Sequence, residues 1–71
     1  MEDSDLGLGD PIREAIAALP ERQRLVLFLR YFADLDYRTI ADIVGVETAT
    51  VGATLHAARE AIRLTLEEAR P

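Results

Sequence analysis

The chain contains no cysteine and no tryptophan, and its single histidine is His56. Without cysteine it cannot form disulfides, and one histidine is too few for a zinc site, so neither cross-link can stabilise the fold. No apolar run approaches the roughly 20 residues that cross a bilayer. The first ten residues are acidic, whereas a signal peptide begins with a basic and then an apolar segment. We therefore expect a cytoplasmic protein with no membrane partner.

The chain also lacks the residue groupings of an active site. His56 has no metal co-ligands and no nucleophile to activate, and the threonines have no neighbouring base. Asp34 and Asp36 are explained more simply as a turn and a helix cap than as an acid and a base. We expect no catalytic residue, metal or cofactor, and hence no enzyme.

Seventy-one residues suffice for one small domain, and their charge is unevenly distributed. Residues 1–10 carry four carboxylates and no base, whereas the other 61 residues carry nine carboxylates against eight arginines, a net charge of −1. Residues 1–9 are too polar and glycine-rich to order themselves, so we interpret them as an acidic flexible tail or linker before a domain of residues 10–68. The nearly neutral domain predicts weak DNA binding without excluding it.

Helical spacing of apolar residues and helix-boundary signals predict an all-α fold. Two prolines suit the first position of a helix: Pro11, which follows the potential cap Asp10, and Pro20. Asp36 suits a helix cap, and Gly45 suits a helix end in the left-handed conformation. The sequence shows no strand-type alternation. The prediction is a compact domain of four helices, at about 11–18, 20–33, 37–44 and 48–68.

The segment from Tyr37 to Leu55 has the spacing of a helix-turn-helix. Ala41 is small where two helices would cross closely, Gly45 forms the turn, and Val46 fills it. In such motifs the second helix enters the major groove, with its N-terminal residues at the base edges. An ordinary corner between two helices, with no role in DNA binding, has the same spacing.

The residues around this motif resemble region 4 of bacterial sigma-70 factors, most closely those of the extracytoplasmic-function group. The resemblance covers about residues 10–68. It is carried by these runs: Leu19-Pro20-Glu21-Arg22-Gln23-Arg24, Leu29-Arg30-Tyr31, Tyr37-Arg38-Thr39-Ile40-Ala41, Gly45-Val46, Thr50-Val51 and Leu55-His56-Ala57-Ala58-Arg59.

The resemblance implies a winged-helix-like domain without a wing that ends in a helix-turn-helix. It implies a last helix that reads the minus-35 element of double-stranded promoter DNA, and first helices that dock on the β-subunit flap of RNA polymerase. It further implies a separate minus-10 domain in the same chain, joined by a linker of which the acidic tail is a remnant, and an anti-sigma factor as an additional partner.

The chain departs from the family at the positions that would contact DNA. Family members typically carry a basic-polar-basic run after the Thr-Val pair and another base after the His. Here no cation stands at these positions, which predicts weak DNA binding by the chain alone, because arginine paired to guanine is the commonest specific contact. The predicted DNA-binding residues are Arg38, Thr48, Thr50, Gly52, Ala53, Thr54, His56, Ala57 and Arg59.

The predicted helix 20–33 has more apolar residues than one buried stripe requires. Because the family tolerates polar residues at the positions of Leu25 and Phe28, the resemblance places Val26, Leu29 and Ala33 in the core. Leu25, Phe28 and Phe32 are then left partly exposed as a predicted partner-binding surface. The alternative is that they complete a small core.

Three functions fit the sequence. The first is a promoter-binding module of an alternative sigma factor, whose affinity comes from assembly with polymerase. The second is a sigma-like interaction domain that binds an anti-sigma factor without reading DNA. The third is the output domain of a response regulator, which shares the helix-turn-helix but lacks the Leu-Pro-Glu-Arg-Gln-Arg opening.

Overall fold

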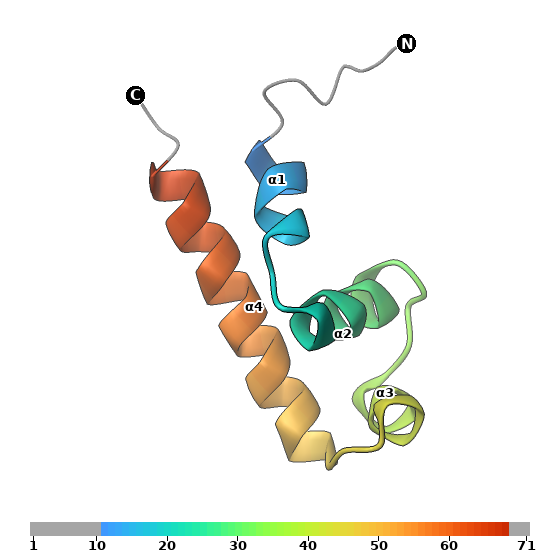
Figure 1. Cartoon of the computed structure of the whole chain (residues 1–71). Helices are drawn as coiled ribbons and strands as arrows, with labels where there is room; N and C mark the ends of the chain where they lie inside the picture. The colour runs from blue at the N-terminus through green and yellow to red at the C-terminus, as the bar shows by residue number, and fades with distance from the viewer. Residues whose placement is uncertain (1–10, 69–71) are drawn as a thin grey trace, which may run out of the picture.

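The computed structural model describes residues 11–68, and every regular element in this range is an α-helix (Figure 1). The predicted tail of residues 1–9 and the predicted cap Asp10 lie outside the described residues. The all-α prediction is therefore confirmed for the described part of the chain. The helices are α1 (Pro11–Ala17), α2 (Glu21–Tyr31), α3 (Tyr37–Val44) and α4 (Thr48–Glu68).

The long helix α4 forms one side of the domain, and each of the other helices packs against it. Its 21 residues span about 30 Å. Figure 1 shows α1 beside the C-terminal half of α4, whereas α2 and α3 lie toward its N-terminal half. Among the helices of residues 11–68, none is long and apolar enough to cross a bilayer.

The core lies where α2, α3 and α4 meet. Val26, Ile40, Val51 and Leu55 are almost completely buried and pack together with Ala41, whose small side chain fits between the helices. Leu27, Leu29, Leu35, Val44 and Val46 pack around this cluster as partly buried residues. Val51 and Leu55 thus pack the last helix onto the preceding one.

Both predicted boundary signals of α3 are confirmed. The carboxylate of Asp36 accepts a 2.8 Å hydrogen bond from the backbone N–H of Thr39, and Gly45 adopts a left-handed φ of 77°. The hydrogen bonds from the Thr39 backbone and side chain stabilise the charged form of Asp36 and lower the pKa of its carboxyl. Short-range chemistry therefore fixes both ends of this helix.

The second helix is shorter than predicted. Pro20 is its cap and not its first residue, and α2 ends at Tyr31 because the N–H groups of Phe32 and Ala33 both bond to the carbonyl of Phe28. The chain then turns through Asp34, which has a φ of 60°. Because the helix has already ended, Ala33 is exposed, and its predicted place in the core is wrong.

Candidate nucleic-acid interface

Helices α3 and α4 form a tight helix-turn-helix. The N–H groups of Gly45 and Val46 both donate to the carbonyl of Ala41, at 2.8 and 3.0 Å, which ends α3 and turns the chain into α4. Val46 is half-buried against the core and fills the turn, as its sequence position predicted. The buried Val51 and Leu55 fix the rotation of α4 about its axis. The opposite side of α4 consequently faces solvent.

Most of the predicted DNA-binding residues lie on the exposed surface of this motif. Gly52 and Thr54 are only partly exposed. The residues that the structure leaves exposed are Arg38, Thr48, Thr50, Ala53, His56, Ala57 and Arg59. The first two turns of α4 contain no charged residue, so this surface offers methyl groups, threonine hydroxyls and one imidazole.

Contacts within the protein engage three of the predicted positions. The hydroxyl of Thr54 donates a 2.7 Å hydrogen bond to the carbonyl of Thr50, one turn earlier. A Cβ atom added to Gly52 would lie 3.5 Å from the ring of Tyr37, so this glycine faces α3 as well as solvent. The guanidinium of Arg59 donates a 2.7 Å hydrogen bond to the phenol oxygen of Tyr31 on α2.

The next arginine along α4 is also paired within the protein. Arg63 bonds to the carboxylates of Glu60, at 2.8 Å, and Glu67. The hydrogen bond and positive charge of Arg63 lower the pKa of the Glu60 carboxyl. The hydrogen bonds and negative charges of Glu60 and Glu67 in turn raise the pKa of Arg63. Both arginines of α4 therefore have partners within the protein, although both side chains remain exposed to solvent.

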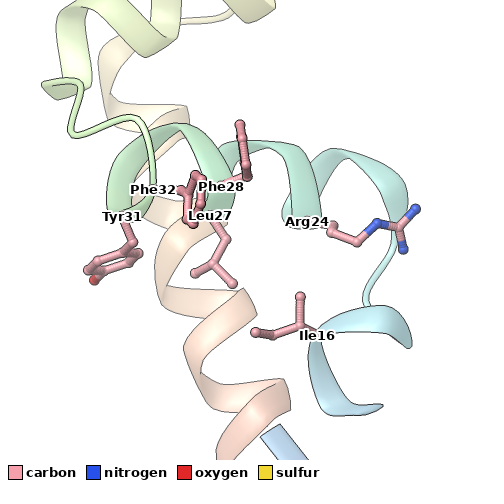
Figure 2. A pocket seen from close by; sticks show the side chains of 6 residues that line it. All are labelled: Ile16, Arg24, Leu27, Phe28, Tyr31 and Phe32. Atoms are coloured by element: carbon pink, nitrogen blue, oxygen red, sulfur yellow. The ribbon is translucent and has the colours of Figure 1, made fainter. Parts of the chain in front are cut away.

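A second surface lies between α1 and α2, where a largely apolar groove of about 410 Å³ opens to solvent (Figure 2). Its lining consists of Ile16, Arg24, Leu27, Phe28, Tyr31 and Phe32. The rings of Phe28 and Phe32 stack with their centroids 5.1 Å apart and are 52% and 81% exposed. Leu25 is 43% exposed but does not line the groove. The predicted exposure of these three residues is confirmed.

The sequence interpretation missed the other groove residues. Ile16 comes from α1, a helix that contributed no residue to the predicted partner-binding surface. The guanidinium of Arg24 donates to the carbonyls of Ala17 and Leu19, at 3.1 and 3.0 Å, and so fixes the end of α1 beside α2. No local sequence signal links Ile16 to Phe28, because the angle between the two helices creates the groove.

The described residues offer no cluster of metal-binding side chains. No group of three or more His, Asp or Glu side chains in residues 11–68 is placed to hold a metal ion. His56 is exposed and belongs to the helix-turn-helix surface. The structure presents two candidate binding surfaces. One is the apolar groove beside α2, and the other is the exposed face of α4, whose side chains are mostly alanine and threonine.

Comparison with known proteins gives a consistent result. The family model for sigma-70 region 4 matches residues 9–62. The chain is 33% identical over 63 residues to the ECF RNA polymerase sigma factor SigW of Bacillus subtilis. The aligned segment covers 89% of this chain and 34% of SigW. Two further sigma factors of the same organism are similar: SigV, 38% identical over 78% of this chain and 33% of SigV, and YlaC, 33% identical over 86% of this chain and 35% of YlaC.

The chain thus spans about a third of the length of each of these relatives. A search of solved structures gives no significant match.

Proposed function

Because the chain belongs to the sigma-70 family, as its region 4, we propose that its helix-turn-helix binds the minus-35 element of promoters. Sigma factors act with RNA polymerase and promoter DNA and are not enzymes. The observation that supports DNA docking is the exposure of Thr50, Ala53, His56 and Ala57 on α4, immediately after a packed helix-turn-helix. Such motifs place the early residues of their second helix at base edges in the major groove.

The α2 surface is proposed to bind RNA polymerase at the flap of its β subunit. Phe28 and Phe32 expose stacked rings beside the groove, and large exposed apolar patches mark interfaces more often than plain surface. An apolar segment of a partner would bury these rings and fill the groove between Ile16 and Phe28. The same surface would also suit an anti-sigma factor, which would then compete with polymerase.

Assembly would compensate for the weak DNA contacts of α4. In the full-length protein we expect a minus-10 domain joined through residues 1–9 as linker, with residues 10–68 as the minus-35 domain. Tethering to polymerase and to that domain would raise the local concentration of α4 near the promoter to about millimolar. A helix with few cations can therefore contribute to promoter choice without binding DNA tightly alone.

The proposal is tested by measuring DNA binding with and without RNA polymerase. The 71-residue chain is titrated into a fluorescent promoter duplex and a scrambled duplex over a salt series, and anisotropy is recorded. We expect weak binding by the chain alone, with a shallow salt slope because few phosphates are neutralised. With core polymerase we expect tighter binding and a clear preference for the promoter duplex.

Equal binding of both duplexes in the presence of polymerase would contradict the proposal. Tight binding of an anti-sigma protein, together with that result, would favour the alternative function, an interaction domain that binds an anti-sigma factor without reading DNA. An Arg38→Gln variant serves as an internal check, because loss of one phosphate contact should weaken binding to both duplexes equally and reduce the salt slope by about one.

A further inference from the structure

The outward face of the first turns of α4 is built from short side chains. Within residues 48–57, no arginine, lysine, asparagine or glutamine is present. The exposed residues of this segment are Thr48, Ala49, Thr50, Ala53, His56 and Ala57. Apart from the imidazole, the chemical groups that this face presents are methyl groups and threonine hydroxyls.

The nearest arginines on α4 are paired with other side chains of the protein. Arg59 donates to Tyr31, which lies on the side toward α2, and Arg63 is paired with Glu60 and Glu67. The hydroxyl of Thr54 is turned back onto the carbonyl of Thr50. The long donors that pair with guanine are therefore absent from residues 48–57, and those that follow are engaged.

The remaining chemistry matches one feature of the major groove. Each base pair presents a distinct pattern there, and thymine alone among the four bases carries a C5-methyl group. Guanine is read by paired donors from Arg or Lys and adenine by Asn or Gln, whereas alanine and threonine methyl groups contact the thymine methyl. Short side chains also let the helix backbone lie close to the bases.

We propose that α4 recognises its DNA chiefly through thymine methyl groups contacted by Thr50, Ala53 and Ala57, and not through guanine edges. This inference rests on the proposed function: the place of α4 in the helix-turn-helix makes this face the DNA-facing one, and its side chains then determine which bases it reads. The groups on this face that can donate to a guanine acceptor are the imidazole of His56 and the hydroxyls of Thr48 and Thr50.

The experiment compares DNA with and without the methyl group. Two random duplex libraries are prepared, one with thymine and one with uracil, which has the same pairing and lacks only the C5-methyl. Complexes of the 71-residue chain with RNA polymerase core are used to select binders from each library, and the selected duplexes are remade with both bases for anisotropy titration. We expect thymine-rich selected sites, with affinity falling about fourfold for each contacted methyl that uracil removes.

An Ala57→Arg variant tests the assignment from the other direction. It adds a donor to the proposed reading face, so we expect tighter binding, guanine in the selected sites and a smaller difference between thymine and uracil. The matched control is Leu64→Arg, which adds the same charge at a half-exposed position about 10 Å further along α4. It should raise affinity for both libraries alike without changing the selected bases.

Two results would overturn the inference and have different meanings. Selected sites that bind equally well with thymine and uracil, or that are defined by guanine, would refute methyl readout and leave promoter binding intact. In the guanine case, loss of the preference in a His56→Ala variant would assign readout to the imidazole. Absence of any selected site in either library would overturn both the inference and DNA binding by this chain.

Discussion

The outer faces of α2 and α4 differ sharply in side-chain size and chemistry. On α2 the exposed side chains are large and apolar, with Phe28 and Phe32 stacked beside a groove. On the first turns of α4 the exposed side chains are small, and alanine and threonine predominate. Large apolar side chains contribute most of the binding energy at protein interfaces, whereas short ones contribute little area.

Under the proposed function the two surfaces have different roles. The α2 surface would hold the domain on a protein partner, and the α4 surface would discriminate among DNA sequences at close range. The two faces are also linked, because Arg59 of α4 bonds to Tyr31 at the edge of the groove. Variants that affect both surfaces, one surface or neither test whether the two surfaces act independently.

The largest effect is expected from Leu55→Ala, which removes a completely buried side chain behind both surfaces. The cavity should lower the free energy of unfolding by about 2–5 kcal/mol, a large share of the stability of a small domain. Urea denaturation followed by circular dichroism measures this loss. The control Ile43→Ala, at a side chain that is 56% exposed, should change stability far less. Loss of only one binding activity in a folded Leu55→Ala variant would contradict a shared core.

A large and selective effect is expected from Phe28→Ser. This change removes a half-exposed ring from the groove, so affinity for RNA polymerase core should fall at least about tenfold, as at interface hot spots. Binding to promoter duplex by the chain alone should stay unchanged. Titration of labelled chain with core polymerase measures the affinity. Leu64→Ser, also about half-exposed but outside the groove, is the matched control, and equal affinities for the two variants would rule out the α2 surface as the polymerase site.

A smaller effect of opposite sign is expected from Gly52→Ala. Glycine inside a helix is less favourable than alanine by about 0.5–1 kcal/mol, and the added Cβ meets Tyr37 at an ordinary contact distance of 3.5 Å. Thermal unfolding should therefore show a more stable protein, with DNA affinity within about twofold of the original. The reciprocal change Ala53→Gly should destabilise the helix by a similar amount. A marked loss of DNA binding in Gly52→Ala would show that the backbone at this position must approach the duplex.

The smallest effect concerns the pH dependence of stability at the start of α3. Hydrogen bonds from Thr39 lower the pKa of Asp36 in the folded protein below 3.8, so its contribution to stability is complete above the unfolded pKa. That contribution is lost as the pH falls through the lower, folded pKa. Asp36→Asn keeps a cap acceptor but removes the titrating charge, so it should lower Tm only slightly at neutral pH and flatten the acid-induced decline. Asp42→Asn removes the same charge from an exposed position on α3 and should retain the wild-type acid response.

The elements of the fold were largely predictable because their signals act over a few residues. Asp36 and Gly45 marked the ends of α3, and both take the predicted conformations. The error at Ala33 arose because the apolar helical pattern continued past Tyr31. No local signal indicated that the backbone would turn at Asp34. The excess of apolar residues on α2 indicated that some of them would be exposed, and the family resemblance then identified Phe28 and Phe32 among these.

The two surfaces were predictable to different degrees. The residues of α4 that face outward followed from helical periodicity, but not the contacts that engage Arg59 and Thr54. The groove was predicted only as an exposed patch, because one of its walls, Ile16, comes from another helix.

Local sequence signals were sufficient to predict both ends of α3, the spacing of the helix-turn-helix and the absence of cations from the first turns of α4. These properties depend on neighbouring residues or on composition. Two features arise only in the folded structure. One is the groove between α1 and α2, and the other is the hydrogen bond from Arg59 to Tyr31, which is 28 residues away in the chain. The reason is physical: a groove and a contact between helices require the packing angles of several helices, which burial of the whole core sets.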